Sequence, residues 1–147
     1  MFLQQATFTE QLSDLVFTQF NIAADIDDIA FLPELTLSRY PADVCPTGIP
    51  SDTAEPLVGG ETFRFAATLA KELGIFIHAS LYEATGFSDG RGLNTAIVID
   101  DHGQLVGRTP KLHIPVTEGY FEDKYFQEGP NQEPYPTYEL ELPGSPA

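Results

Sequence analysis

The chain has 147 residues, a length that suits one modest domain with a single hydrophobic core. Its 22 acidic residues outnumber the 7 lysines and arginines, which gives a formal net charge of -15. This balance argues against nucleic acid and anionic membranes as partners, because both are bound through basic side chains. The single cysteine, Cys45, has no disulfide partner within the chain, which suits a reducing compartment. Since the first residues also lack the pattern of a signal or transit peptide, we expect a cytoplasmic protein.

The first part of the chain predicts a helix, a strand and a long loop. Apolar residues at helical spacing predict a helix from about residue 7 to 20. The run IAFL, residues 29–32, predicts a short buried strand that ends at Pro33. Residues 38–60 contain several prolines and glycines with little periodicity. We expect them to form a long ordered loop, and such loops are often functional.

The middle of the chain carries the strongest helix and strand patterns. ETFRFAATLAKELG, residues 61–74, predicts a helix that stops at its last glycine. Five residues make up its expected buried face: Phe63, Ala66, Ala67, Ala70 and Leu73. IFIHASLY predicts a strand covered on both faces, and NTAIVID, DHG and QLVGR predict a β-hairpin. A weak strand is expected in TYELEL. Helices that alternate with strands indicate a layered α/β domain.

Three charged residues are candidates for chemistry. Glu34 directly follows a predicted strand, a position that favours a proton acceptor in a pocket; a glutamate that caps the next turn or pairs with Arg39 is the alternative. Lys111 leaves the hairpin between two prolines, so a stiff loop would hold its ammonium ready for a developing oxyanion; a solvated loop lysine is the alternative. Glu122, in GYFEDKYF, is either a second active-site carboxylate or part of an acidic surface.

Other reactive side chains give weaker patterns. The nearest charged neighbour of Cys45 in the sequence is Asp43, and a carboxylate disfavours the thiolate, so we expect an inert free thiol. The histidines His78, His102 and His113 lack the spacing of a metal site. We therefore expect neither a metal nor a cofactor.

Taken together, the segments resemble the nitrilase superfamily of carbon–nitrogen hydrolases. The resemblance covers about residues 28–130 and includes PELTLSRYP, AKELGI, ASLYE, the NTAIVID–DHGQLVGR hairpin, KLHIP and GYFEDKYF. The pieces are most similar to the branch that hydrolyses N-carbamoyl amines and aliphatic amides. The resemblance implies an α/β fold that is part of a four-layer α-β-β-α sandwich. It also implies a small-molecule amide or N-carbamoyl substrate, no cofactor, and a homo-oligomer in the full-length form.

The family's catalytic centre is Glu, Lys and Cys, usually with a second Glu. By motif, Glu34 corresponds to the general base, Lys111 to the lysine that stabilises the oxyanion, and Glu122 to the additional glutamate. Tyr40, in RYP, corresponds to a pocket-lining tyrosine, and His113, in KLHIP, is assigned with it to substrate binding. The resemblance implies a thioester intermediate at an amide, ureido or nitrile carbon.

The chain also departs from the family pattern. It contains no G-x-x-x-C-W-like element for the nucleophile, and Cys45 is in the wrong place to replace it. The usual opening strand is not found, and Pro110 stands where a basic residue normally precedes the lysine. We therefore interpret residues 1–147 as a partial domain, truncated at both ends and nearly inactive alone, whose Pro/Glu-rich residues 131–147 lead toward the nucleophile. The alternatives are a non-catalytic pseudoenzyme and an acidic interaction module with the same partial fold.

Overall fold

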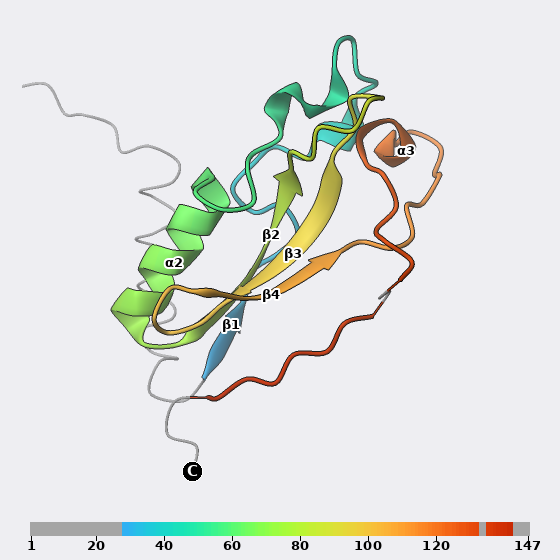
Figure 1. Ribbon diagram of the computed structural model, residues 1–147. Helices are drawn as coiled ribbons and strands as arrows, with labels where there is room; N and C mark the ends of the chain where they lie inside the picture. Colours follow the sequence, from blue (N-terminus) through green and yellow to red (C-terminus); the bar gives the residue numbers. More distant parts are fainter. Residues whose placement is uncertain (1–27, 133–134, 143–147) are drawn as a thin grey trace, which may run out of the picture.

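The computed structural model describes residues 28–132 and 135–142, and there four strands form one sheet in the order β1-β2-β3-β4 (Figure 1). The strands are β1 (Ile29–Phe31), β2 (Phe76–Glu83), β3 (Leu93–Ile99) and β4 (Leu105–Pro110). β1 runs parallel to β2, and β2, β3 and β4 are antiparallel neighbours. The strands predicted in IAFL and IFIHASLY and the hairpin are therefore confirmed, although β1 is not buried throughout, because Phe31 is exposed. The helix expected at residues 7–20 lies outside the described residues.

Helices and loops complete the α/β architecture. Helix α2 (Glu61–Leu73) lies against one face of the sheet, and the single turn of α3 (Glu122–Tyr125) lies near one end of it (Figure 1). The expected loop contains two short 3-10 helices, η1 (Pro41–Asp43) and η2 (Pro50–Thr53), and is otherwise irregular up to α2, apart from one β-bridge. No helix in the described part of the chain is long and apolar enough to cross a membrane.

Both ends of helix α2 are capped. At its start the carboxylate of Glu55 accepts hydrogen bonds from the backbone N–H and the hydroxyl of Thr62, at 2.8 and 2.5 Å, which satisfies one of the unpaired donors of the first turn. At its end Gly74 adopts a left-handed conformation with φ 65°, the usual helix stop. The predicted limits of this helix are confirmed.

The buried face of α2 differs in part from the expected one. Phe65 and Leu69 are in the core, whereas Phe63 and Leu73 are only partly buried at its margin. The alanines of the prediction, Ala66, Ala67 and Ala70, are buried as expected. These small residues let the helix approach the sheet closely. Phe65 and Leu69, which flank the alanines on the helix surface, therefore also reach the core.

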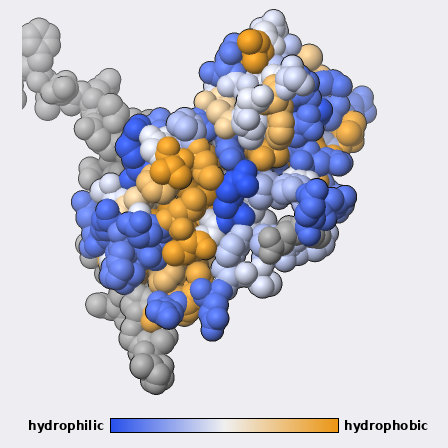
Figure 2. Space-filling view, viewed as in Figure 1, coloured by the Kyte–Doolittle hydropathy of each residue, from blue (hydrophilic) through white to orange (hydrophobic). Residues whose placement is uncertain are grey.

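The two faces of the sheet have different environments. Residues such as Ile77, Leu81 and Ile97 point toward α2 and form the main core. The alternate residues of the same strands, among them Ser80 and Asn94, point to the opposite face, since side chains alternate along a strand. In the space-filling view a band of apolar surface runs alongside α2 and is flanked by hydrophilic surface (Figure 2).

TYELEL is not a strand. Residues 137–142 are described without regular secondary structure. Instead, the ring of Tyr138 packs over Gly107, and its hydroxyl exchanges hydrogen bonds with the backbone of Arg108. The alternation of apolar and polar residues predicts a strand only where a free strand edge pairs with it, and this segment docks through a side chain.

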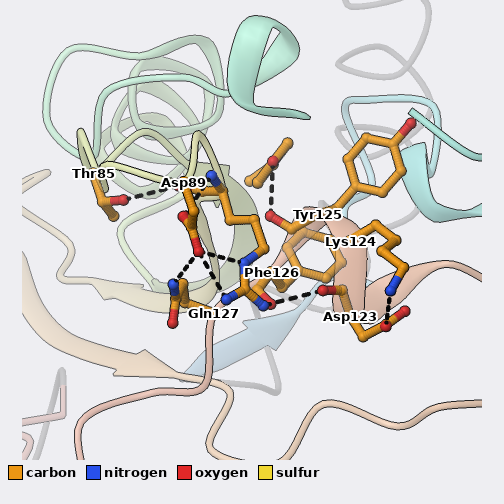
Figure 3. A network of polar contacts seen from close by, with 9 residues as sticks. Thr85, Asp89, Asp123, Lys124, Tyr125, Phe126 and Gln127 are labelled. Carbon is orange, nitrogen blue, oxygen red and sulfur yellow. Dashed lines mark hydrogen bonds and ion pairs between the residues drawn. The ribbon is translucent and has the colours of Figure 1, made fainter. Parts of the chain in front are cut away.

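A second, smaller core joins the long loop, β2 and the segment that carries α3. Its buried residues are Leu35, Ala42, Tyr82, Tyr125 and Phe126, and the hydroxyl of Tyr82 donates to the backbone carbonyl of Tyr125 at 2.9 Å. Polar contacts around Arg91 reinforce this junction. Its guanidinium contacts Asp89 and the backbone carbonyls of Asp123 and Phe126, while Gln127 donates to Asp89 (Figure 3).

We expect Tyr82→Phe to lower the free energy of unfolding by about 1 kcal/mol, because a buried hydrogen bond is lost. Burial raises the pKa of Tyr82 from 10.0 to about 12. Between these two pH values the unfolded chain loses the hydroxyl proton and the folded protein keeps it. The stability that Tyr82 contributes is therefore fully present below pH 10 and is lost as the pH rises through about 12. Urea unfolding at pH 8 and pH 11 should show a shallower alkaline loss of stability in the variant. Tyr120→Phe, at an exposed ring, is the matched control, and equal effects of the two changes would contradict this assignment.

Candidate active site

Glu34 sits in a tight turn directly after β1. The next residue, Leu35, is buried and has a positive φ of 49°, which costs a residue with a side chain about 1–3 kcal/mol. Its backbone N–H donates to the hydroxyl oxygen of Ser80, on β2, at 2.7 Å. Burial and this hydrogen bond hold the turn in its strained form. The turn thereby fixes the backbone position from which the Glu34 side chain extends.

Lys111 is the first residue after β4. Its backbone N–H donates to the carbonyl of Asn94 at 2.8 Å, which continues the β3–β4 pairing one residue further, and its own carbonyl accepts from Gly129 at 2.9 Å. Both backbone groups of Lys111 are therefore fixed. The expectation that this lysine is held rigidly at the end of a strand agrees with this geometry.

The three candidate catalytic residues meet around the Lys111 ammonium. Its Nζ lies 3.0 Å from Oε2 of Glu122 and 3.4 Å from Oε1 of Glu34, a residue 77 positions away in the chain. The side chain of Glu34 is 50% exposed, whereas that of Glu122 is only 11% exposed. The two carboxylates therefore differ: Glu34 is open to solvent and to a ligand, and Glu122 is enclosed against the lysine.

The charge environment keeps Lys111 protonated. Partial burial acts to lower the pKa of Lys111, but the hydrogen bond to Glu122 and the charges of Glu34 and Glu122 outweigh it and raise the pKa above the ordinary 10.5. Tyr40 lies beside the same carboxylates. Burial, followed by a hydrogen bond to Glu122, raises the pKa of the Tyr40 hydroxyl, which stays protonated as a donor. Lysine and tyrosine thus both present protons to this site at neutral pH.

Two adjoining cavities open around these residues. One, of about 410 Å3, is lined by Glu34, Tyr40 and Glu122 with Thr117 and Tyr120. The other, of about 300 Å3, lies over the sheet face opposite α2 and is lined by Glu34 and Lys111 among others. Glu34 lines both cavities, so one small molecule beside its carboxylate can also reach the lysine.

The structure does not bring every predicted residue to this place. His113 is exposed and lines neither of the two cavities. Cys45 is an exposed free thiol in the loop between η1 and η2, and it also lines neither cavity. The alternative pairing of Glu34 with Arg39 is wrong, because Arg39 pairs with Asp43 at 2.7 Å. Among the described residues, no group of three or more His, Cys, Asp or Glu is placed to bind a metal.

Sequence reasoning missed two residues of the site, Ser80 and Asn94. Ser80 holds the turn after Glu34, as described above. The side-chain amide of Asn94, on β3, donates to Oε1 of Glu34 at 2.5 Å. Each is a polar residue that is buried in a central strand of the sheet. That pattern is visible in ASLYE and NTAIVID and is the sequence feature that points to them.

Comparisons with known proteins identify the family of the chain. The family model for carbon-nitrogen hydrolases matches residues 21–142. β-Ureidopropionase of Arabidopsis thaliana is 35% identical over 82 residues, which cover 55% of this chain and 20% of that protein. N-carbamoylputrescine amidase of Solanum tuberosum is 37% identical over 76 residues, which cover 52% of this chain and 24% of that protein. The matched region is thus only about a fifth to a quarter of the length of these relatives.

Solved structures show the same fold. A carbon-nitrogen hydrolase from Helicobacter pylori G27 superposes with a TM-score of 0.68 at 24% identity, over 84% of this chain and 39% of that chain. An N-terminal amidase with an Asn-Glu-Ala peptide superposes with a TM-score of 0.61 at 16% identity, over 85% of this chain and 29% of the other. The expected α/β class and its nitrilase-like architecture are confirmed by these likenesses. From the family match over most of its length, the chain belongs to the carbon–nitrogen hydrolase family.

Proposed function

We propose that this chain supplies the general base and the oxyanion-stabilising lysine of a hydrolase that cleaves small amides or N-carbamoyl amines. One observation carries the proposal: Lys111 Nζ lies 3.4 Å from Oε1 of Glu34 across 77 residues of chain, beside a cavity that both residues line. The substrate class is taken from the activities of the relatives, which are a β-ureidopropionase and an N-carbamoylputrescine amidase.

In the proposed reaction Glu34 accepts and returns a proton, and Lys111 stabilises the oxyanion. Glu34 takes the thiol proton of a cysteine, and the thiolate attacks the carbonyl carbon to form a tetrahedral intermediate. Lys111 donates hydrogen bonds to the resulting oxyanion. The C–N bond then breaks, and Glu34 returns the proton to the leaving amine. Finally Glu34 accepts a proton from the water that attacks the thioester. The C–S bond breaks, the acid is released, and the thiolate takes the proton back from Glu34.

The two glutamates take different roles in this scheme. Glu34 is half exposed and therefore accessible to a substrate and to water. Glu122 is nearly enclosed, contacts Lys111 at 3.0 Å and also interacts with Tyr40. We assign Glu34 as the base, Glu122 as the residue that holds the lysine, and Tyr40 as a wall of the substrate pocket. The assignment of His113 to substrate binding has no support from its exposed position.

The nucleophile is proposed to come from a segment other than these 147 residues. Cys45 is the chain's single cysteine, it is exposed, and it lines neither of the cavities at Glu34. The matched relatives are several times longer than the aligned region. Residues 28–130 would thus be the base-and-lysine part of the domain, within a cytoplasmic homo-oligomer in the full-length form.

The chain itself should show no turnover of an N-carbamoyl amine or an aliphatic amide, because a base without an aligned nucleophile has nothing to activate. The assay compares wild type with Cys45→Ala, and both should equal the uncatalysed rate. Turnover by the wild type that disappears in Cys45→Ala would overturn the placement of the nucleophile.

In a longer form that carries a nucleophile, Glu34→Gln should lower kcat by about 10²–10⁴-fold, whereas Glu118→Gln, at an exposed glutamate, should not. Absence of any turnover in that form would favour the non-catalytic alternatives.

A further inference from the structure

We propose that Asn94 is a positioning residue that orients the Glu34 carboxylate and the Lys111 backbone together, leaving Oε2 of Glu34 as the oxygen that accepts the proton. This inference rests on the proposed function for its catalytic meaning. Its structural part, a shared anchor for the two residues, can be tested without any assay of turnover.

Asn94 occupies a rigid position. It is the second residue of β3, a strand paired with β2 on one side and β4 on the other, and it is only 4% exposed. It pairs with Tyr82 in the β2–β3 register, which directs its side chain to the sheet face opposite α2. A side chain in such a place has little freedom to move, so what it contacts is fixed by the fold.

Asn94 contacts both members of the proposed catalytic pair. Its side-chain Nδ2 donates to Oε1 of Glu34 at 2.5 Å, and its backbone carbonyl accepts the N–H of Lys111 at 2.8 Å. Two residues that lie 77 positions apart in the chain are thus both hydrogen-bonded to the same strand residue. A shift of Asn94 would therefore change their separation directly.

The contacts also distinguish the two oxygens of Glu34. Among the described residues, the two donors that reach this carboxylate, Asn94 Nδ2 and Lys111 Nζ, both contact Oε1. The lone pairs of Oε2 are thereby left for a thiol, an amine or a water. An amide suits this task because it donates a hydrogen bond without titrating, so it cannot compete for the proton that Glu34 transfers.

Asn94 is not part of the main hydrophobic core. The face of β3 toward α2 is filled by Ile97 and Ile99, and Asn94 belongs to the other face. Burying an amide is costly unless it is hydrogen-bonded. Since Glu34 is half exposed, its carboxylate would find water if Asn94 were replaced by the similarly sized leucine. Asn94→Leu should consequently leave the protein folded while it releases Glu34.

The experiment measures the pKa of Lys111 by NMR titration of its Nζ in the full chain. Wild type is compared with Glu34→Gln, Asn94→Leu and Thr95→Val. Thr95 is the matched control, because it is the next residue of β3, is buried, and donates to a different glutamate, Glu83, at 2.6 Å. Glu34→Gln should lower the Lys111 pKa, since the charge of Glu34 helps to raise it. Asn94→Leu should lower it in the same direction, as Glu34 turns to solvent and its charge moves away from the ammonium.

Each outcome decides the matter. The proposal is supported if Asn94→Leu follows Glu34→Gln and Thr95→Val equals wild type. It is overturned if Asn94→Leu equals wild type, if Thr95→Val has the same effect as Asn94→Leu, or if Glu34→Gln itself changes nothing. The titration does not depend on turnover, so a failure of the proposed function leaves this test intact.

Kinetics in a longer, nucleophile-bearing form test the catalytic meaning. Asn94→Leu should lower kcat by about 10- to 100-fold with little change in KM, because a misoriented base affects the chemical step more than binding. Thr95→Val should leave kcat near the wild-type value. If Glu34→Gln retains full activity, the proposed function fails. If Glu34→Gln is inactive while Asn94→Leu keeps the wild-type kcat, only the positioning role fails.

Discussion

Replacement of Lys111 by methionine is expected to lower kcat by about 10²–10³-fold in a form that carries the nucleophile, equivalent to about 2.7–4 kcal/mol of transition-state stabilisation. The ammonium lies 3.4 Å from Glu34 and 3.0 Å from Glu122, and it is the positive charge nearest to the proposed base. Methionine keeps the length of the side chain but removes all three donors. KM should change much less than kcat, because the lost interaction forms mainly with the oxyanion of the transition state.

Two further variants define the Lys111 prediction. Lys124→Met is the matched control, since Lys124 lies on α3 close to Glu122, but it is 57% exposed and pairs with Asp123. Its kcat should equal that of wild type. Lys111→Arg should restore little activity, because a planar guanidinium differs from a compact ammonium in shape and donor geometry. Retention of more than about a tenth of kcat by Lys111→Met would contradict the oxyanion role.

The largest expected loss of stability comes from Arg108→Met, at about 3 kcal/mol. Arg108, on β4, donates to both carboxylate oxygens of Glu83 on β2, with two contacts of 2.8 Å and one of 3.2 Å. Glu83 is only 6% exposed and also accepts from Thr95 at 2.6 Å. Removal of the arginine leaves a buried carboxylate with one neutral partner. Because Arg108 is itself partly exposed, we expect the lower end of the usual 3–5 kcal/mol range.

Urea unfolding measures this effect as a lower midpoint at an unchanged slope. The double variant Glu83→Leu/Arg108→Met should recover most of the stability, since an apolar pair of similar size carries no unpaired charge. Arg39→Met is the matched control, because Arg39 forms an exposed pair with Asp43 that is expected to contribute less than about 1 kcal/mol. Equal losses for Arg39→Met and Arg108→Met would contradict the role assigned to the buried pair.

The predicted elements were confirmed where the pattern that defines them is local. The helix that ends at Gly74 carries its own periodicity and its own stop, and the hairpin carries its own turn around Gly103. TYELEL also has a local pattern, but a strand depends on a partner, and there Tyr138 packs over β4 instead. Burial on α2 was only partly predicted, because which side chains reach the core depends on how closely the alanines let the helix approach.

The site was predictable only in part for the same reason. Nothing in the spacing of Glu34 and Lys111 shows that they meet; the family resemblance indicated it, and the structure brings them together. Asn94 and Ser80 were missed because their contacts join residues 60 and 45 positions apart and depend on the register of β2 and β3. A polar residue within a strongly predicted central strand is the sequence feature that points to such contacts.

The most direct test of the account is a double-mutant cycle on kcat with Glu34→Gln and Lys111→Met, in a form that carries the nucleophile. If the two residues act as one unit on one bound substrate, the double variant should be about as slow as the slower single variant, because groups that act together are not additive. If the two losses multiply, or if either single variant keeps wild-type kcat, Glu34 and Lys111 do not share a catalytic centre and the account is wrong.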